Sequence, residues 1–299
     1  MPKNFWEFLI LGVIVSLVQI HFDGDIAVNH QVSMRTLGKT LIHLQNSIDR
    51  AYLEQHYGQL WKFAKMRQEF YSDVELLVQE PREGGYVLDF LSSNPVTKSV
   101  INRVSSAVNG AVEASKKAGL DKATKIEESL SKRISQVESG ILVPKDLRTM
   151  IDNPDASVIR QYGDRAISRE IDQILSIIRS SHAGDSTFEL TLRGDKSIKF
   201  EFNKTSAGSF HSTVSRRELG EPVLYNATIS SLDRHNNNGK IYNLITEKVA
   251  NIHFFNESFL EMAMPFFQGK KAMTFVGSPL IEYGAFDPNA GDIYFIKLA

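Results

Sequence analysis

The densest group of side chains with metal-binding chemistry follows an apolar segment near the N-terminus. His21, Asp23, Asp25 and His30 combine imidazoles, which suit zinc or iron, with carboxylates, which suit hard cations. Their spacing matches no defined metal motif. An Asp-Gly-Asp sequence after a strand is also an ordinary turn, because glycine permits positive φ and Asp accepts local backbone hydrogen bonds. We therefore expect a structural turn, and leave open whether Asp23, Asp25 and His30 bind a metal.

The sequence contains none of the common catalytic motifs. It has no HExxH, GxSxG, GxxxxGK[ST] or GxGxxG pattern. It also has no cysteine, which excludes thiolate catalysis, disulfides and cysteine-ligated metal centres. Glu80, Glu83 and Asp89 are candidate paired carboxylates, although a solvated hairpin explains them more simply. We expect a protein that is not an enzyme, without catalytic residues and without a cofactor.

Basic and aromatic side chains are interleaved between residues 33 and 67. The segment contains Arg35, Lys39, Arg50, Lys62, Lys65 and Arg67 together with Tyr52, Tyr57, Trp61 and Phe63. Such a mixture suits single-stranded nucleic acid, whose bases stack on aromatic rings. We favour an amphipathic helix with a basic outer face. The whole chain has 34 basic and 35 acidic side chains, so it has no global field that would attract a polyanion.

The elements that position these residues begin with residues 1–95. Residues 5–22 are the most apolar stretch, but a membrane-spanning helix needs about 20 apolar residues and the uninterrupted run covers only Phe8 to Val15. Alternating apolar and polar positions then predict a buried strand over roughly 13–22. A signal or membrane anchor over 5–22 is the alternative. A long helix capped by Ser33 and a hairpin around 80–85 complete a small α+β layer.

The remaining chain divides into a helical segment and a β-rich segment. Residues 96–184 have apolar positions at helical spacing and predict a connecting helical segment. Its apolar stripes are narrow, which is typical of two-helix contacts or of a self-association seam. Residues 185–299 contain many short strands, and Asn238-Gly239 is typical of a hairpin. They predict a small barrel or sandwich, for which an OB-like barrel is one candidate. The fold class is therefore α+β in three parts.

The order of features resembles one family. An early strand ends in FDGD, VSMRTLGKTLIHLQNSIDRAYL follows, and then comes a hairpin around PREGGYVLDF. After a helical middle, the β-rich end contains GSPLIEYGAFDPNAGDIYF. In this order and over most of its length, the chain resembles the phage-encoded Gabija anti-defence proteins.

The resemblance implies an inhibitor that acts in the cytoplasm of an infected bacterial host. Its partner would be the bacterial Gabija complex, which joins an ATPase-nuclease subunit to a helicase-like subunit. The inhibitor would form a homo-oligomer larger than a dimer around that complex and block its DNA binding and cleavage, with no contact to membrane or nucleic acid of its own. The resemblance carries no motif whose functional residues transfer position by position.

The contact residues must therefore be sought among the types that dominate interfaces, buried aromatics and Arg. Arg216 and Arg217, and Tyr283 and Phe286, stand beside turn residues in the β-rich end. We expect this end to contact a partner; alternatively, both aromatic rings fill the barrel. A different function also remains open, a phage or prophage protein that binds nucleic acid through the C-terminal β domain and the basic segment 33–67.

Overall fold

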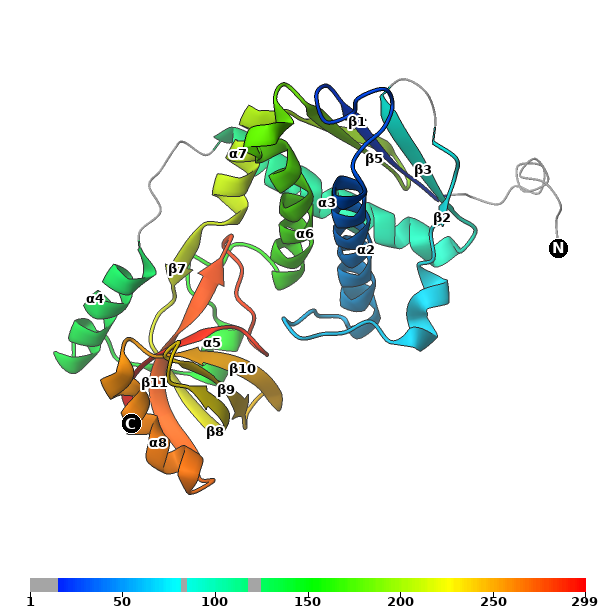
Figure 1. Cartoon of the computed structure of the whole chain (residues 1–299). Helices are drawn as coiled ribbons and strands as arrows, with labels where there is room; N and C mark the ends of the chain where they lie inside the picture. Colours follow the sequence, from blue (N-terminus) through cyan, green and yellow to red (C-terminus); the bar gives the residue numbers. More distant parts are fainter. Residues whose placement is uncertain (1–15, 82–84, 118–124) are drawn as a thin grey trace. The chain divides into compact units, whose positions relative to one another are not determined.

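The computed structural model describes residues 16–81, 85–117 and 125–299. It confirms an α+β protein with a small antiparallel sheet, a helical middle and a C-terminal β-barrel (Figure 1). Its contacts divide the chain into two compact units. Of the described residues, the first unit gathers those within 16–59, 65–117 and 166–214, and the second gathers those within 60–64, 125–165 and 215–299.

A five-stranded antiparallel sheet forms the base of the first unit, in the order β2-β3-β1-β5-β6. The strands are β1 (Ser16–Asp23), β2 (Leu77–Val78), β3 (Tyr86–Ser92), β5 (Thr187–Arg193) and β6 (Ser197–Phe202). Val18, Ile20 and Phe22 of the central strand β1 are fully buried, as alternation along a strand requires. The expected N-terminal strand is thus confirmed from residue 16 onward; residues 1–15, where an anchor was the alternative, lie outside the described residues.

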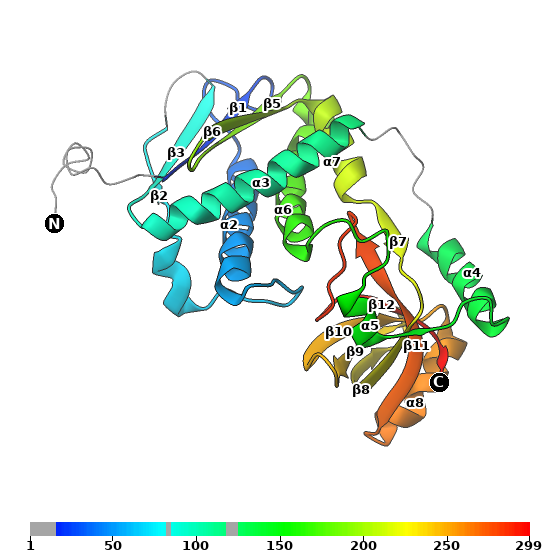
Figure 2. The same ribbon diagram turned by 180° about the vertical axis from the view of Figure 1, so that it is seen from behind.

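Helices cover one side of this sheet (Figures 1 and 2). They are α2 (Met34–Tyr57), α3 (Pro95–Lys117), α6 (Tyr162–Arg179) from Ala166 onward and α7 (Lys204–Val214), with short 3-10 turns at Gln68–Asp73 and Ser181–Ala183. Ser33 caps α2 as expected, because its hydroxyl accepts the backbone N–H of Thr36 at 3.0 Å. Gly58 ends the helix at a φ of 71°, a conformation that glycine adopts without strain.

A closed five-stranded barrel forms the core of the second unit. Its strands run in the order β8-β9-β10-β12-β11, and β11 pairs back to β8. They are β8 (Val223–Asp233), β9 (Asn238–Asn243), β10 (Lys248–His253), β11 (Ala272–Glu282) and β12 (Ile293–Leu298), with α8 (Glu257–Gln268) between β10 and β11. Short strands β4 (Lys145–Asp146) and β7 (Arg217–Leu219) extend the sheet, and α4 (Ile126–Glu138) and α5 (Leu147–Asp152) complete the unit.

The three-part division expected at residues 95 and 184 differs from these units. The hairpin β5–β6 was assigned to the C-terminal domain, but β5 pairs with β1 along its whole length. The reason is that each edge of β1 presents unpaired backbone N–H and C=O groups, and β5 pairs with the edge that β3 leaves open. The helical middle is divided as well, because α3 packs in the first unit while α4 and α5 belong to the second.

Candidate functional site

The barrel strands have the connectivity of an OB-fold. Counted along the chain, the first three strands are neighbours, the fifth follows the third in parallel, and the fourth closes on the first. A helix between the third and fourth strands completes that pattern. In OB-folds the outer face of the second and third strands, here β9 and β10, is the usual ligand-binding face. Fold alone does not carry function, so the side chains on this face must decide what it does.

Alternation along β9 and β10 divides their side chains between the barrel core and this face. Ile241 and Ile252 point into the buried core, whereas Tyr242 and Val249, which are paired across the two strands, are 37% and 38% exposed. Lys240 is also exposed. The face therefore presents aromatic, apolar and cationic groups side by side.

A tight turn of the chain lies against this face. We call it the Lys62 turn and define it as Leu60–Ala64. The Ala64 N–H bonds to the Trp61 carbonyl at 3.0 Å and closes the turn, while the side chains of Leu60 and Ala64 are buried. Lys62 stands at the tip, where its Nζ donates to both carboxylate oxygens of Asp292 at 2.7 Å. Its backbone N–H donates to Asp287 Oδ2, also at 2.7 Å.

Two barrel lysines bracket the turn by cation–π contacts. Lys248 Nζ lies 5.0 Å from the centre of the Trp61 ring, and Lys240 Nζ lies 6.0 Å from the centre of the Phe63 ring. Both distances fall within the range in which an ammonium group is attracted to an aromatic face. The turn is thus held by a charged tip and by two flanking rings.

Asp292 is held in its charged form by a set of donors. Burial by itself would raise the pKa of this carboxyl, but contacts from His253, Lys62 and Asn251 outweigh it and hold the pKa well below its ordinary value. Asn251 Nδ2 donates at 2.8 Å, and His253 Nε2 lies 3.6 Å from the same oxygen, Oδ1. The face therefore contains a fixed negative charge at the position of the Lys62 tip.

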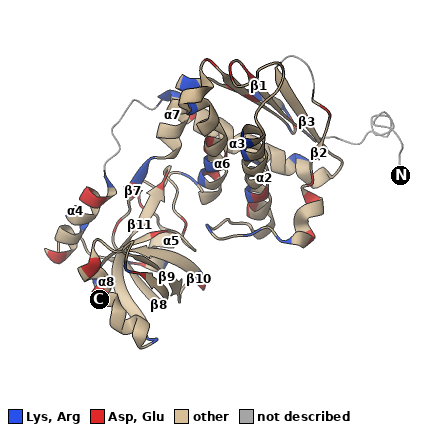
Figure 3. Ribbon diagram, viewed as in Figure 1, with Lys and Arg blue, Asp and Glu red and all other residues tan. Residues whose placement is uncertain are grey.

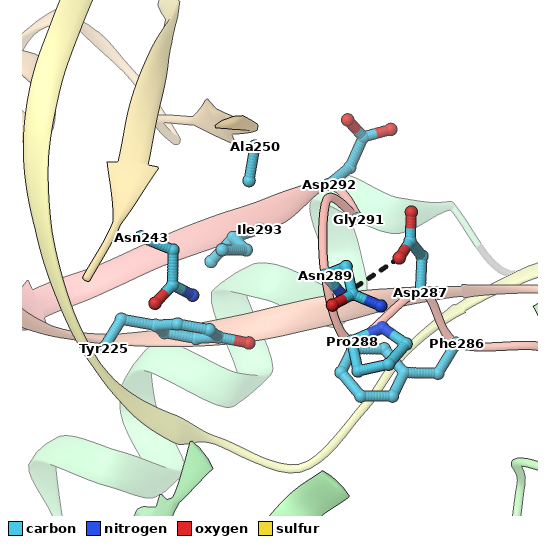
Figure 4. A pocket seen from close by; sticks show the side chains of 10 residues that line it. All are labelled: Tyr225, Asn243, Ala250, Phe286, Asp287, Pro288, Asn289, Gly291, Asp292 and Ile293. Atoms are coloured by element: carbon cyan, nitrogen blue, oxygen red, sulfur yellow. Dashed lines mark hydrogen bonds between the residues drawn. The ribbon is translucent and has the colours of Figure 1, made fainter. Parts of the chain in front are cut away.

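The pKa of Asp287 is shifted in the opposite direction, above its ordinary value. Burial raises its pKa, against the lowering effect of the backbone N–H groups of Lys62, Ala290 and Asn289. The last two N–H groups belong to the loop that Asp287 begins, at 3.1 Å for Ala290 and 3.0 Å for Asn289; Figure 4 shows the Asn289 bond. Asp287 thus organises the loop before β12 and anchors the backbone of the Lys62 turn.

A small hollow lies beneath this loop (Figure 4). Its lining includes Tyr225, Asn243, Phe286 and Asp287. Its free volume is about 10 Å³, which is roughly the space one water molecule needs. Among the described residues, the Tyr225 hydroxyl has no hydrogen-bond partner. The hollow suits a single water and is too small for a substrate.

The proposed metal ligands near the N-terminus have separate partners. His21 Nδ1 lies 2.8 Å from Glu189 Oε2, Asp23 accepts the Gly24 N–H, and Asp25 accepts the Asp185 N–H. His30 contacts the backbone of Gly85. Across residues 16–81, 85–117 and 125–299, no three His, Asp or Glu side chains are grouped so as to hold a metal ion.

The candidate carboxylates of the first hairpin are also separated. Glu80 is exposed, whereas Asp89 is buried and accepts the side-chain amide of Gln19 at 2.8 Å. Glu83 lies outside the described residues. In the described part of the chain, Glu80 and Asp89 therefore lie in different environments and do not form a carboxylate pair.

The expected contact residues divide into two pairs. Tyr283 and Phe286 are 5% and 8% exposed, so they fill the second unit instead of facing a partner. The Tyr283 ring packs against Arg160, whose Cζ is 4.3 Å from the ring centre. Arg216 and Arg217 are exposed, and Arg217 Nε lies 2.9 Å from Glu282 Oε1. Phe286 packs in the barrel core, as the alternative interpretation expects, whereas the Tyr283 ring is buried against Arg160.

The interleaved segment 33–67 is divided between the two units. Its helical part, α2, packs in the first unit, whereas Trp61, Lys62 and Phe63 belong to the barrel unit. Sequence analysis missed Asp287 and Asp292 as partners of this segment. The only signal was their place in an Asp-Pro-Asn-Ala-Gly-Asp turn, which is common in loops of no special function.

The comparisons with known proteins add no identity. No protein-family model matches the chain, and no match was found among curated proteins. In the part of the chain that the structure describes, no helix is long and apolar enough to cross a membrane.

Proposed function

We propose that the protein is a non-enzymatic inhibitor, encoded by a phage, that binds the bacterial Gabija complex in the cytoplasm of the infected host. It assembles there as a homo-oligomer larger than a dimer and blocks DNA binding and cleavage. The resemblance of FDGD, PREGGYVLDF and GSPLIEYGAFDPNAGDIYF to Gabija anti-defence proteins supports this identity. The structural observation that supports a binding role is the set of apolar and charged side chains exposed on the barrel unit.

That unit exposes many large apolar side chains. They are Phe63, Ile141, Val143, Ile159, Leu224, Tyr242, Leu244, Val249, Phe255, Met262 and Phe267. Contiguous apolar surface is typical of protein–protein contact sites. Tyr242 and Val249 are direct cross-strand neighbours, and Phe255 packs edge to face on Phe259 of α8. Figure 3 shows Lys and Arg beside Asp and Glu in both units, a mixed pattern that favours protein over polyanion as the partner.

The proposal is tested by co-expressing the tagged protein with both Gabija subunits and measuring the masses that co-purify. We expect both subunits to co-purify and DNA cleavage by the complex to stop. Met262→Asp places a charge on the exposed surface of α8 and should weaken this association. Ile42→Asp, at an exposed apolar position on α2 that is more open to solvent than Met262, is the control. Absence of both subunits from the purified material would contradict the proposal.

The same proposal includes self-association, and one of the two arguments for it no longer holds. The apolar stripes of α3, α4 and α6 were one motive for self-association. In the structure, Val104, Leu130 and Ile171 on these helices are buried within their own units. The homo-oligomer is therefore supported only by the resemblance to the Gabija anti-defence proteins. Light scattering of the purified protein, with and without Gabija, should give a mass above that of a dimer; a monomer mass in both samples would contradict it.

The barrel face supports a second candidate function, binding of single-stranded nucleic acid. OB connectivity together with Trp61 and Phe63 beside Lys240 and Lys248 is the observation that favours it. The carboxylates of Asp287 and Asp292 on the same face oppose it. Binding of this kind should weaken steeply with salt, because phosphate contacts release counterions. A titration of labelled oligonucleotide at several salt concentrations separates it from the first proposal.

A further inference from the structure

The Lys62 turn contacts the barrel as a bound peptide contacts its receptor. Residues on both sides of it, up to Gln59 and from Lys65, belong to the other unit. The hydrogen bonds described above to the barrel come from the backbone N–H and the side chain of Lys62 at its tip. The distance along the chain between Lys62 and its two carboxylate partners is 225 and 230 residues. The contact is therefore a tertiary docking event.

The charges of the face specify what kind of group docks there. At the tip, Asp292 and Asp287 accept the ammonium and the backbone N–H of Lys62. Around them stand Asn251 and His253 from β10, which also contact Asp292. Lys240 and Lys248 face the two rings and not the carboxylates. A cationic side chain flanked by two aromatic rings suits this face, because the cation pairs with the carboxylates while the rings contact the two lysines.

We propose that the outer face of β9 and β10 is a binding site for a turn of a partner protein that presents Lys or Arg between aromatic side chains. The chain's own Lys62 turn occupies this site in cis and competes with the partner. This inference rests on the proposed function for the existence of a protein partner. It goes beyond it by stating the chemistry that the partner must present.

Charge complementarity selects a cationic protein segment over nucleic acid. Displacing the Lys62 turn uncovers two carboxylates and removes one ammonium group from the face. A phosphate backbone would then meet Asp292 directly, and like charges at contact cost several kcal/mol. A Lys or Arg side chain restores the ion pair that the departing Lys62 breaks.

The cis contact sets how tightly a partner binds. A receptor whose open form is a minor state binds with an affinity reduced by the open fraction. If the turn is released in about 1–10% of molecules, removing it should tighten partner binding about 10- to 100-fold.

The test uses the full chain and a fluorescein-labelled peptide of residues 58–65, GQLWKFAK. The receptors are the wild type, Lys62→Met, and the triple variant Trp61→Ser, Lys62→Ser, Phe63→Ser, which deletes the competing turn chemistry. Lys65→Met removes an exposed charge next to the turn and is the matched control. Thermal melting establishes that each variant is folded; where the triple variant is not, Lys62→Met carries the test.

We expect the peptide to bind the turn-deleted variants about 10- to 100-fold more tightly than the wild type and Lys65→Met. Adding Asp292→Asn to Lys62→Met should abolish that gain, because the site itself is then lost. The same peptide with Lys62→Glu should not bind. An oligothymidylate of about 15 nucleotides should bind none of the variants.

Three results would overturn the inference. They are equal peptide binding by wild type and both turn variants, equal binding of the Lys and Glu peptides, and oligothymidylate binding by the turn variants without peptide binding. The last result would assign the face to nucleic acid. The assay contains no Gabija subunit, so its outcome is independent of the co-purification that tests the proposed function.

Discussion

The sheet of the first unit and the barrel of the second differ in how their strands are collected from the chain. The central strand β1 is flanked by β3, in which Asp89 is 70 residues from its neighbour Gln19, and by β5, in which Glu189 is 168 residues from His21. All five barrel strands lie between residues 223 and 298. The barrel is thus a nearly local structure, whereas the sheet depends on closing long loops, which costs entropy before its contacts form.

The two regions also differ in their charged groups. The first unit pairs histidines with acids on neighbouring helices, as in His43 and Glu170 at 2.7 Å and His211 and Asp172 at 2.9 Å. The barrel unit pairs Lys62 with Asp292 on an outer face. The side chains of Lys62 and Asp292 are covered about as well as those of His43 and Glu170, so the proposed exchange of the Lys62 pair rests on its place in a docked turn and not on its exposure. The comparison predicts that the first unit is structural and that the second performs recognition.

Replacing Ile20 with Asp should have the largest effect on this comparison. Ile20 is fully buried in β1 between Leu88 and Leu190 of the neighbouring strands. An aspartate there buries a charge without a partner, and we expect it to lower the free energy of unfolding by more than about 4 kcal/mol. Hydrogen exchange should show lost protection in β1, β3 and β5 but retained protection in the barrel. A variant that melts and exchanges like the parent would contradict the central position of β1.

A matched pair of core substitutions should sharpen the division into units. Phe275 stacks on Tyr225 and Phe295 inside the barrel, with ring centres 5.4 and 5.6 Å apart. Phe188 packs on Phe22 in the sheet at 4.9 Å. Each Phe→Ala change should cost about 3–5 kcal/mol. Hydrogen exchange should localise the first loss to the barrel and the second to the sheet; loss of protection throughout both units in both variants would show that they unfold as one.

The first unit should lose stability at alkaline pH and the barrel unit at acid pH. Burial and a 2.6 Å hydrogen bond to Asp73 raise the pKa of Tyr52 in the first unit to about 12. The unfolded chain then releases this proton first, so stability falls as the pH rises above about 10. The lowered pKa of Asp292 means that its contribution is complete above about pH 4 and is lost as the pH falls below that value.

Denaturant unfolding followed by hydrogen exchange at pH 3, 7 and 11 measures these limits. Tyr52→Phe should flatten the alkaline loss in the first unit, and Asp292→Asn should flatten part of the acid loss in the barrel. The raised pKa of Asp287 works against the acid loss, because protonation of this group favours the folded state. Unchanged pH profiles in both variants would contradict the assignment of these groups.

The double variant Arg216→Ala, Arg217→Ala should have the smallest effect on stability. Both side chains are exposed, and the Arg217–Glu282 pair is open to solvent on the arginine side. We expect a loss below about 1 kcal/mol, since the Tyr283 N–H keeps its 2.9 Å bond to the Arg216 carbonyl. Inhibition of Gabija DNA cleavage should fall if these arginines contact a partner. Unchanged fold, oligomeric mass and inhibition would remove this surface from the contact.

Much of the secondary structure was predictable because its signals are local. The alternation of Val18, Ile20 and Phe22 predicted β1, and Ser33 marked the start of α2. The hairpin between β8 and β9 was also predicted, although the residue with positive φ in its turn is Asn237 and not Asn238 or Gly239. The strands after residue 185 predicted a small barrel or sandwich, and those from β8 onward form the barrel because they pair with near neighbours in the chain.

The sequence by itself determined the α+β class, the positions of most elements and the local barrel. Only the tertiary structure decided that β5 joins β1, that Tyr283 and Phe286 are buried, and that the Lys62 turn lies on Asp287 and Asp292. The physical reason is that propensity, capping and alternation act over a few residues. Which distant strand or carboxylate a segment meets depends on the packing of the whole chain, and the Asp-Pro-Asn-Ala-Gly-Asp sequence itself carries no sign of a remote lysine.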